Sequence, residues 1–267
     1  MRATIKSSDC VSSEISGEHF IYEHTFFFVK EGTTKCYDGN KMHTFKSGDF
    51  GLIRKNRLSK YSKEKNSQAK TTFIILDEVF LKKFQERYAS EIVVFRSNET
   101  FMHIPKNSLL TNFIRSLIPY YNSAGKIDET FADLKREELL LILLKLKPEL
   151  SGLFFDYGIP DKINLEAFMN KNFMFNVNIE RFAYLTGRSL SAFKRDFKII
   201  FNETPNRWLV KRRLQEAYFL IEKKDKKPSD IYLDLGFETL SHFSTAFKKQ
   251  FGISPTELTE LNKKYNR

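Results

Sequence analysis

A stretch of 21 residues near the C-terminus is repeated at an offset of 50 residues, and this repeat restricts the fold more than any other feature of the chain. The first copy runs from Leu185 to Pro205 and the second from Leu235 to Pro255, without gaps. Identical residues at matching positions include Leu185 and Leu235, Ser191 and Ser241, Phe193 and Phe243, Phe197 and Phe247, Lys198 and Lys248, Phe201 and Phe251, and Pro205 and Pro255. Agreement of this extent does not readily arise by chance. The repeat therefore predicts two copies of one structural unit.

Each copy predicts two helices joined by a tight turn. A short amphipathic helix is expected over residues 179–185 and again over 229–235, followed by Gly187 or Gly236. The second helix carries phenylalanines at i, i+4 and i+8, a spacing that places them on one face, where we expect them to form core. The opposite face is polar. This arrangement is typical of a helix-turn-helix unit, and residues 206–221 are expected to form one long helix between the two units.

The charge distribution favours a polyanionic partner for the repeated segment. The chain has 44 Lys and Arg against 33 Asp and Glu, a net charge of +11. Residues 161–267 hold 20 of the basic and 13 of the acidic side chains, or +7, so most of the excess lies there. A basic helix face is often only solvated. Two matching units joined by a basic helix make double-stranded DNA the better interpretation.

The outer faces of the predicted second helices, together with the connecting helix, supply the candidate DNA contacts. The candidates for phosphate contacts are Lys198, Arg212, Arg213, Lys248 and Lys249. The candidates for base-edge contacts are Ser191, Lys194 and Arg195 in the first unit and Ser241, Ser244 and Thr245 in the second. Further candidates on the same faces are Ser189, Ala192, Thr239 and His242. Arg195 is the strongest, because a guanidinium can donate two hydrogen bonds to O6 and N7 of guanine.

Residues 161–262 resemble the DNA-binding domain of the AraC/XylS family of bacterial transcription regulators. The resembling residues are Ile231, Leu235-Gly236-Phe237, Ser241, Phe243, Ala246-Phe247-Lys248, Phe251-Gly252 and Ser254-Pro255, and in the first half Ser191, Arg195-Asp196-Phe197-Lys198, Pro205, Leu209, Arg213 and Ala217. The resemblance implies two recognition helices in successive major grooves, promoter DNA and RNA polymerase as partners, and a homodimer. The sequence departs from the family pattern at Thr245, where Arg is common, at Tyr232, where Ala is common, and at Leu258, where an aromatic residue is common.

The N-terminal half has the pattern of a small β-barrel or sandwich followed by helices. Strands are expected over residues 19–29, 33–37, 41–45, 50–54 and 71–76, with turns at Asp38-Gly39-Asn40 and Ser47-Gly48-Asp49. Helices are expected over 78–88, 107–120 and 129–146, and one more strand over 92–95. Leucine side chains are expected on every side of the helix 129–146, and Leu134 and Leu141 would lie on the same side. This helix is expected either to lie in the core or to form a dimer face.

The strand-rich half also resembles the cupin-like effector and oligomerisation domain of many AraC/XylS members. The expected fold class is therefore α+β with two domains. Residues 1–160 would form a small cupin-like β domain with helices, which could take a small-molecule or protein effector. Residues 161–267 would form an all-α domain of two helix-turn-helix units joined by a long helix.

Nothing in the sequence predicts a reaction, a cofactor or a metal. His19, His24, His43 and His103 are scattered without a His-x-His pair, and no phosphate loop, nucleophile elbow or triad order is present. Cys36 is expected to be a packing residue rather than a redox sensor. No secretory signal and no apolar run of ~18–20 residues is found, so we expect a cytoplasmic protein without a membrane segment. The prediction is a sequence-specific transcription regulator; the alternative is a cupin-type enzyme with an accessory helical domain.

Overall fold

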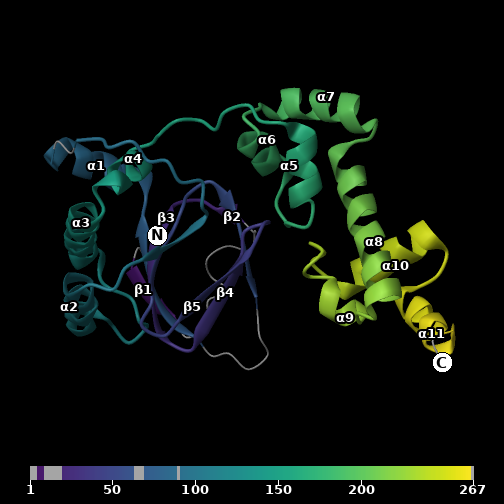
Figure 1. Ribbon diagram of the computed structural model, residues 1–267, viewed down its shortest axis with the longest axis horizontal. Coiled ribbons are helices and arrows are strands. Elements are labelled where there is room, and N and C mark those ends of the chain that lie inside the picture. The colour runs from purple at the N-terminus through teal and green to yellow at the C-terminus, as the bar shows by residue number, and fades with distance from the viewer. Residues whose placement is uncertain (1–4, 9–19, 63–68, 89–90, 266–267) are drawn as a thin grey trace. The chain divides into compact units, whose positions relative to one another are not determined.

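The chain forms two compact units, Met1–Gly158 and Ile159–Arg267. The computed structural model describes residues 5–8, 20–62, 69–88 and 91–265 (Figure 1). All of the described strands lie in the first unit, and the second unit is helical. The α+β class is thereby confirmed, with a β-rich half followed by two helix-turn-helix units.

Two antiparallel sheets form the body of the first unit. The larger sheet has the strand order β1-β9-β3-β6-β10, and a second sheet has the order β5-β4-β8. The strands of the larger sheet are β1 (Ile5–Ser8), β9 (Lys70–Leu76), β3 (His24–Glu31), β6 (Phe50–Ile53) and β10 (Phe101–Ile104). Those of the second sheet are β4 (Thr33–Tyr37), β5 (Met42–Lys46) and β8 (Lys60–Ser62), and a short ladder joins β2 (Phe20–Ile21) to β7 (Arg57–Leu58).

The central strand β3 separates two hydrophobic cores, because successive side chains of a strand point to opposite faces. Phe26 packs with residues of the helices, whereas Phe27 packs with Phe45 of β5 and with Phe73. Gly51 lies opposite Phe27 in the ladder, and a Cβ at Gly51 would come within 2.2 Å of the Phe27 ring. Only glycine can therefore pair with Phe27 at this point of the sheet.

The thiol of Cys36 belongs to the same core as Phe27. The side chain is fully buried, and burial raises the pKa of the thiol above its usual range. Since the thiolate is the reactive form, Cys36 is a packing residue in the folded protein.

Helices cover the other face of the larger sheet. They are α1 (Glu78–Tyr88), α2 (Ser108–Ser116), η1 (Ile118–Tyr120), α3 (Glu129–Leu146), η2 (Pro148–Leu150) and α4 (Ser151–Phe154). The predicted helices 78–88 and 129–146 are confirmed. The helix expected over 107–120 ends at Ser116 and continues as a 3-10 turn, because a proline cannot donate to the helical ladder.

The strand predicted over residues 92–95 is wrong. This segment has no regular secondary structure, and it contacts the start of α4. The Val93 amide donates to Ser151 Oγ at 2.9 Å, and a Cβ at Gly152 would come within 2.2 Å of the Val93 carbonyl oxygen. The strand that completes the sheet is β10, which pairs with β6 and which the sequence pattern did not predict.

The helix α3 is partly core and partly surface. Leu139, Leu140 and Leu143 are fully buried. Leu134 and Leu141 remain 61% and 44% exposed. One face of α3 therefore forms core, as one of the two interpretations expected, and leucines remain on the other face.

The second unit contains the helices α5 (Leu165–Asn172), α6 (Ile179–Leu185), α7 (Leu190–Phe201), α8 (Pro205–Lys224), α9 (Pro228–Ile231), α10 (Leu240–Phe251) and α11 (Pro255–Tyr265). The long helix α8 has α7 packed near one end and α9 to α11 near the other (Figure 1). The predicted helix over 179–185 is confirmed as α6. The helix predicted over 229–235 ends at Ile231 and continues as turns, and α5 was not anticipated.

The phenylalanines of the repeat form core, as predicted. Phe193, Phe197, Phe243 and Phe247 have no solvent exposure. Phe197 lies edge-on to Trp208, and Phe247 stacks on Tyr218, so both stripes pack against α8. The last phenylalanine of each stripe lies at the helix end and is only partly buried. None of the helices in the described ranges is both long and apolar enough to cross a membrane.

Candidate nucleic-acid interface

The two repeat copies begin their second helices in the same way. The Ser189 side chain accepts from the Ala192 amide, and the Thr239 side chain accepts from the His242 amide. Each is an N-cap, which satisfies an amide that the helix leaves without a partner. Both candidates thus have a local structural role at the ends of α7 and α10.

The turn before α7 is closed by a tight contact with the start of the unit. Gly187 has a φ of +65°, and a Cβ there would lie 2.5 Å from the Asp161 backbone. Arg188 donates from Nη1 to the carbonyl oxygens of Ile163 and Thr186, at 2.9 Å and 2.6 Å. Residues 161–163 therefore form part of the first helix-turn-helix unit.

The outer face of α7 carries the exposed cations. Lys194, Arg195 and Lys198 are exposed together with Ser191, whereas Ala192 is half-buried. Within the described part of the chain, no hydrogen bond or ion pair holds the side-chain ammonium group of Lys194 or Lys198. This face can therefore meet a polyanion without first breaking internal contacts of the two lysines.

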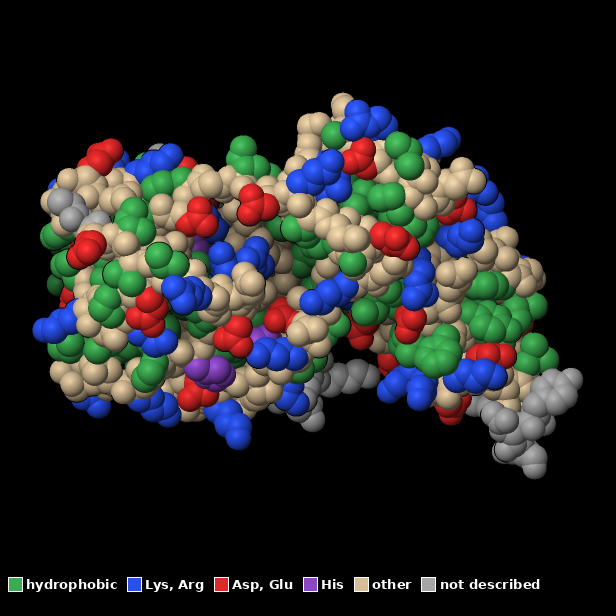
Figure 2. Space-filling view, turned by 45° about the horizontal axis from the view of Figure 1, so that its top comes forward, with side chains coloured by type: hydrophobic (Ala, Val, Ile, Leu, Met, Phe, Trp, Pro, Cys, Tyr) green, Lys and Arg blue, Asp and Glu red, His purple; other side chains and the backbone are tan. Residues whose placement is uncertain are grey.

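The outer face of α10 has fewer charges. Ser241, His242 and Thr245 are exposed and Ser244 is half-buried. The exposed Lys248 and Lys249 lie in the last turn. Lys and Arg side chains reach the surface in several places among acidic ones, rather than forming one continuous patch on the face shown in Figure 2.

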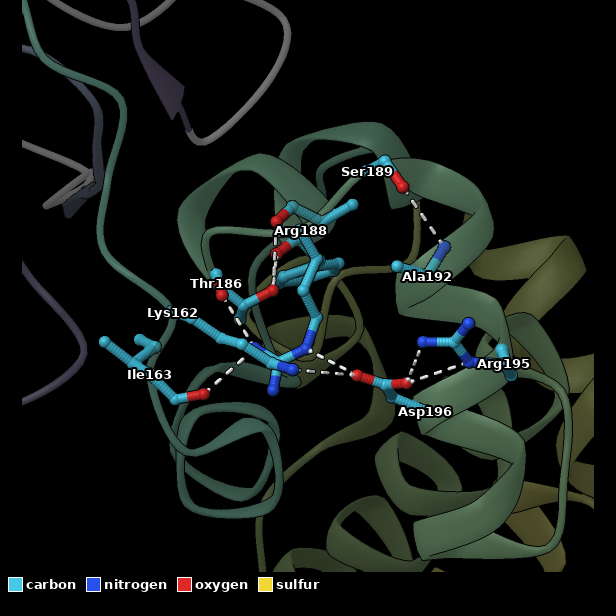
Figure 3. Close-up of polar contacts among 10 residues, drawn as sticks. Lys162, Ile163, Thr186, Arg188, Ser189, Ala192, Arg195 and Asp196 are labelled. Atoms are coloured by element: carbon cyan, nitrogen blue, oxygen red, sulfur yellow. Dashed lines mark hydrogen bonds and ion pairs between the residues drawn. The ribbon is translucent and has the colours of Figure 1, made fainter.

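Asp196 connects Arg195 to the turn (Figure 3). Asp196 Oδ1 accepts from Nε and Nη2 of Arg195, at 3.3 Å and 3.1 Å. Asp196 Oδ2 accepts from Nε of Arg188 at 3.1 Å and lies 3.7 Å from the Lys162 ammonium. Hydrogen bonds from Arg188 and then Arg195 hold the pKa of Asp196 below its usual value, so this carboxylate is ionised at neutral pH. Neither Asp196 nor Arg188 was among the sequence-based candidates.

Arg213 was predicted to contact phosphate, and the structure corrects this. The side chain is buried and donates from Nε to the Phe173 carbonyl, from Nη2 to the Phe175 carbonyl and from Nη1 to the Gly236 carbonyl, all within 2.9 Å. Burial lowers the pKa of Arg213 to about 10, which still leaves it charged at neutral pH. The sequence held a signal for this, since Arg213 falls in the four-residue spacing of Leu209, Ala217 and Ile221.

The neighbouring Arg212 remains near the surface. Its guanidinium lies 4.7 Å from the centre of the Phe173 ring, an arrangement favourable for a cation–π contact, and Nη1 is 3.9 Å from Glu216. The Arg212 side chain is partly exposed and can still reach a phosphate.

Two family descriptions cover most of the chain. Residues 24–153 match the ExsA N-terminal regulatory domain, and residues 182–260 match a helix-turn-helix domain. The virulence regulon transcriptional activator VirF of Yersinia enterocolitica is 24% identical over 250 residues, which cover 89% of this chain and 90% of VirF. The HTH-type transcriptional regulator ExsA of Pseudomonas aeruginosa is 24% identical over 240 residues, covering 88% and 85%.

The solved structures that resemble the whole chain include ToxT from Vibrio cholerae. The TM-score is 0.39 at 15% identity, with 96% of each chain covered. The match to the regulatory domain precedes the match to the helix-turn-helix domain, and the alignments with VirF and ExsA extend over nearly the whole of this chain. The chain belongs to the AraC/XylS family of DNA-binding transcription regulators.

Proposed function

We propose that α7 and α10 are recognition helices that enter successive major grooves on one face of promoter DNA. The common caps and the common phenylalanine stripes support equivalent roles for the two helices. The 20 residues of α8 lie between them, and at 1.5 Å per residue this helix is about 30 Å long. That length is close to the ~34 Å that separates successive turns of one groove.

The observation that carries the proposal is the exposed cationic face of α7. Lys198, Arg212, Lys248 and Lys249 would contact phosphates, and Arg195 with Lys194 would reach base edges. Ser191, Ser241, Ser244, Thr245, Ala192 and His242 would lie at the groove surface, and the capped starts of α7 and α10 at Ser189 and Thr239 would approach the DNA backbone.

Binding should depend steeply on salt concentration. With Arg213 removed from the set, Lys198, Arg212, Lys248 and Lys249 remain as phosphate contacts that can displace counterions. About four such contacts predict that log K against log salt has a slope of roughly −3 to −4. Fluorescence anisotropy with a labelled duplex at several salt concentrations measures the slope, both for the full chain and for the fragment 159–267. A slope near zero would contradict the electrostatic part of the proposal.

The two units should contribute unequally to base reading. Arg195→Ala should cost about 1–3 kcal/mol on the best operator and relax the preference at one base pair, since a bidentate contact to guanine is lost. Lys248→Ala should weaken binding to all sequences and flatten the salt slope by about one. Thr245→Ala, the matched position in the second unit, should change specificity little.

Selection from a randomised duplex library compares the base preferences of these three variants. An unchanged preference for Arg195→Ala together with a large change for Thr245→Ala would reverse the roles of the two units.

For the first unit we propose self-association and response to an effector. We propose that the whole protein is a cytoplasmic regulator that acts on RNA polymerase at promoters and catalyses no reaction. The support is the match to a regulatory domain over residues 24–153 and the exposed leucines of α3.

If the protein is a homodimer through this face of α3, the Leu141→Glu variant should be monomeric, because a charge would be buried at the interface. Lys46→Glu, at an exposed position of β5 in the second sheet and away from α3, is the control and should remain dimeric. Sedimentation velocity measures both, and a Leu141→Glu dimer would place the interface elsewhere.

A further inference from the structure

The carboxylate of Asp196 divides its two oxygen atoms between two arginines. Oδ1 faces Arg195, whose side chain is 71% exposed, and Oδ2 faces Arg188, whose side chain is 8% exposed. The Asp196 side chain is 18% exposed, and Figure 3 shows it between the two arginines. A nearly buried arginine is therefore connected through one carboxylate to an arginine that reaches into solvent.

Arg188 provides a rigid anchor for this connection. Its guanidinium donates to two backbone carbonyls, at Ile163 and Thr186, as well as to Asp196. Thr186 is fully buried, and its hydroxyl in turn donates to the carbonyls of Phe182 and Ala183 in α6. Asp196 is thus held by the turn and by α6, and not only by its own helix.

The contact with Asp196 occupies only one edge of the Arg195 guanidinium. Nε and Nη2 point toward Oδ1. A guanidinium has five N–H donors, so Nη1 and the outer hydrogen of Nη2 are left for a second acceptor pair. These are the donors that a bidentate contact to O6 and N7 of guanine requires. Since a long exposed side chain otherwise loses rotamer entropy on binding, holding it in one orientation beforehand favours the directed contact.

The matching positions of the second unit carry neither member of this pair. At the offset of 50 residues, Arg195 corresponds to Thr245 and Asp196 to Ala246. The aspartate therefore occurs only in the copy whose recognition helix has an arginine at the preceding position. On a surface that meets phosphates, a carboxylate otherwise opposes binding through repulsion.

We propose that Asp196 is a positioning residue that holds Arg195 for the reading of one guanine, and that it thereby sets the base specificity of the first helix-turn-helix unit. This inference rests on the proposed DNA-binding function of α7. Asp196 would lower affinity for DNA in general and raise discrimination at one base pair, so its removal should move these two quantities in opposite directions.

The test is selection from a randomised library with the full chain, followed by competition binding of the selected operator and of duplexes changed at single positions. Asp196→Ala should reduce the preference for guanine at the Arg195 position about 5- to 10-fold, a part of the discrimination given by a bidentate pair. Binding to unrelated DNA should become equal or tighter. In the Arg195→Ala background, Asp196→Ala should no longer change that base preference.

Glu166→Ala in the first turn of α5 is the matched control, since it removes one exposed carboxylate from the same unit. It should leave the base preference unchanged. Melting of each variant is measured in parallel, and Asp196→Asn, which keeps the shape of the side chain, replaces Asp196→Ala if the alanine variant does not fold.

Three results would overturn the inference. Unchanged or sharper guanine preference with tighter operator binding would mean that Asp196 only restrains Arg195 in the free protein. An equal loss of preference at all positions, also in the Arg195→Ala background, would mean a general structural role. If the wild-type chain selected no motif, the proposed function itself would fail, and this outcome is distinct from a selected motif that Asp196→Ala leaves intact.

Discussion

Replacing Phe197 or Phe247 with alanine should lower the free energy of unfolding of the C-terminal unit by about 3–5 kcal/mol. Both side chains are completely buried between their own helix and α8. Each substitution leaves a cavity that the surrounding aromatic rings cannot fill without moving. Urea denaturation followed by helical circular dichroism measures the change, and DNA binding should be lost as the unit unfolds.

Ile199→Ala is the control for this experiment, because Ile199 lies on the same helix as Phe197 and is 75% exposed. It should change the free energy of unfolding by less than about 0.5 kcal/mol. If Phe197→Ala unfolded at the same urea concentration as Ile199→Ala, the assignment of the phenylalanine stripe to the core would be wrong.

Arg213→Met should destabilise the same unit by at least ~3 kcal/mol, since each hydrogen bond to a charged group contributes about 1.5–3 kcal/mol. The variant keeps an apolar stem but removes the charged donor from three carbonyl oxygens, at Phe173, Phe175 and Gly236. Arg213→Lys should recover only part of the loss, because one ammonium group cannot reproduce the planar fork of a guanidinium.

Arg212→Met is the matched control for Arg213→Met. It lies one position away on α8 and is partly exposed, so its loss should affect DNA affinity more than stability. If Arg212→Met were the more destabilising of the two, Arg213 would not be the structural residue that its hydrogen bonds indicate.

The sequence predicted elements that are determined locally. The phenylalanine stripe of α7 and the ends of α3 and α6 follow from spacing and capping within one helix, and the structure agrees. The repeat at an offset of 50 residues identified two similar units, because similarity between two segments of one chain can be read directly from the sequence.

The contacts that the sequence did not reveal join residues far apart in the chain. Arg213 and Arg195 are the same residue type on polar-looking helices. Spacing along α8 indicates that the first is buried, but its three acceptors, the carbonyls of Phe173, Phe175 and Gly236, lie more than 20 residues away in the chain. The β-branched segment 92–95 has strand propensity but pairs with no strand among the described residues, whereas β10 pairs with β6. Asp196 was overlooked because its role depends on Arg188, which is held by the backbone at residue 163.

The close packing of Gly187 against the Asp161 backbone also determines where the DNA-binding half can be exchanged between proteins. The lead-in at residues 161–163 closes the turn and accepts a hydrogen bond from Arg188, although it precedes the first helix of this half. In a chimera joined at Leu165, residues 161–163 would be replaced by those of the other protein. The packing on Gly187 and the hydrogen bond from Arg188 would then depend on residues that did not evolve with this unit. A chimera joined at or before Ile159 would carry the closure with it. The transferable DNA-binding module of this regulator therefore begins before its first helix, and a swap designed from helix boundaries alone would cut into it.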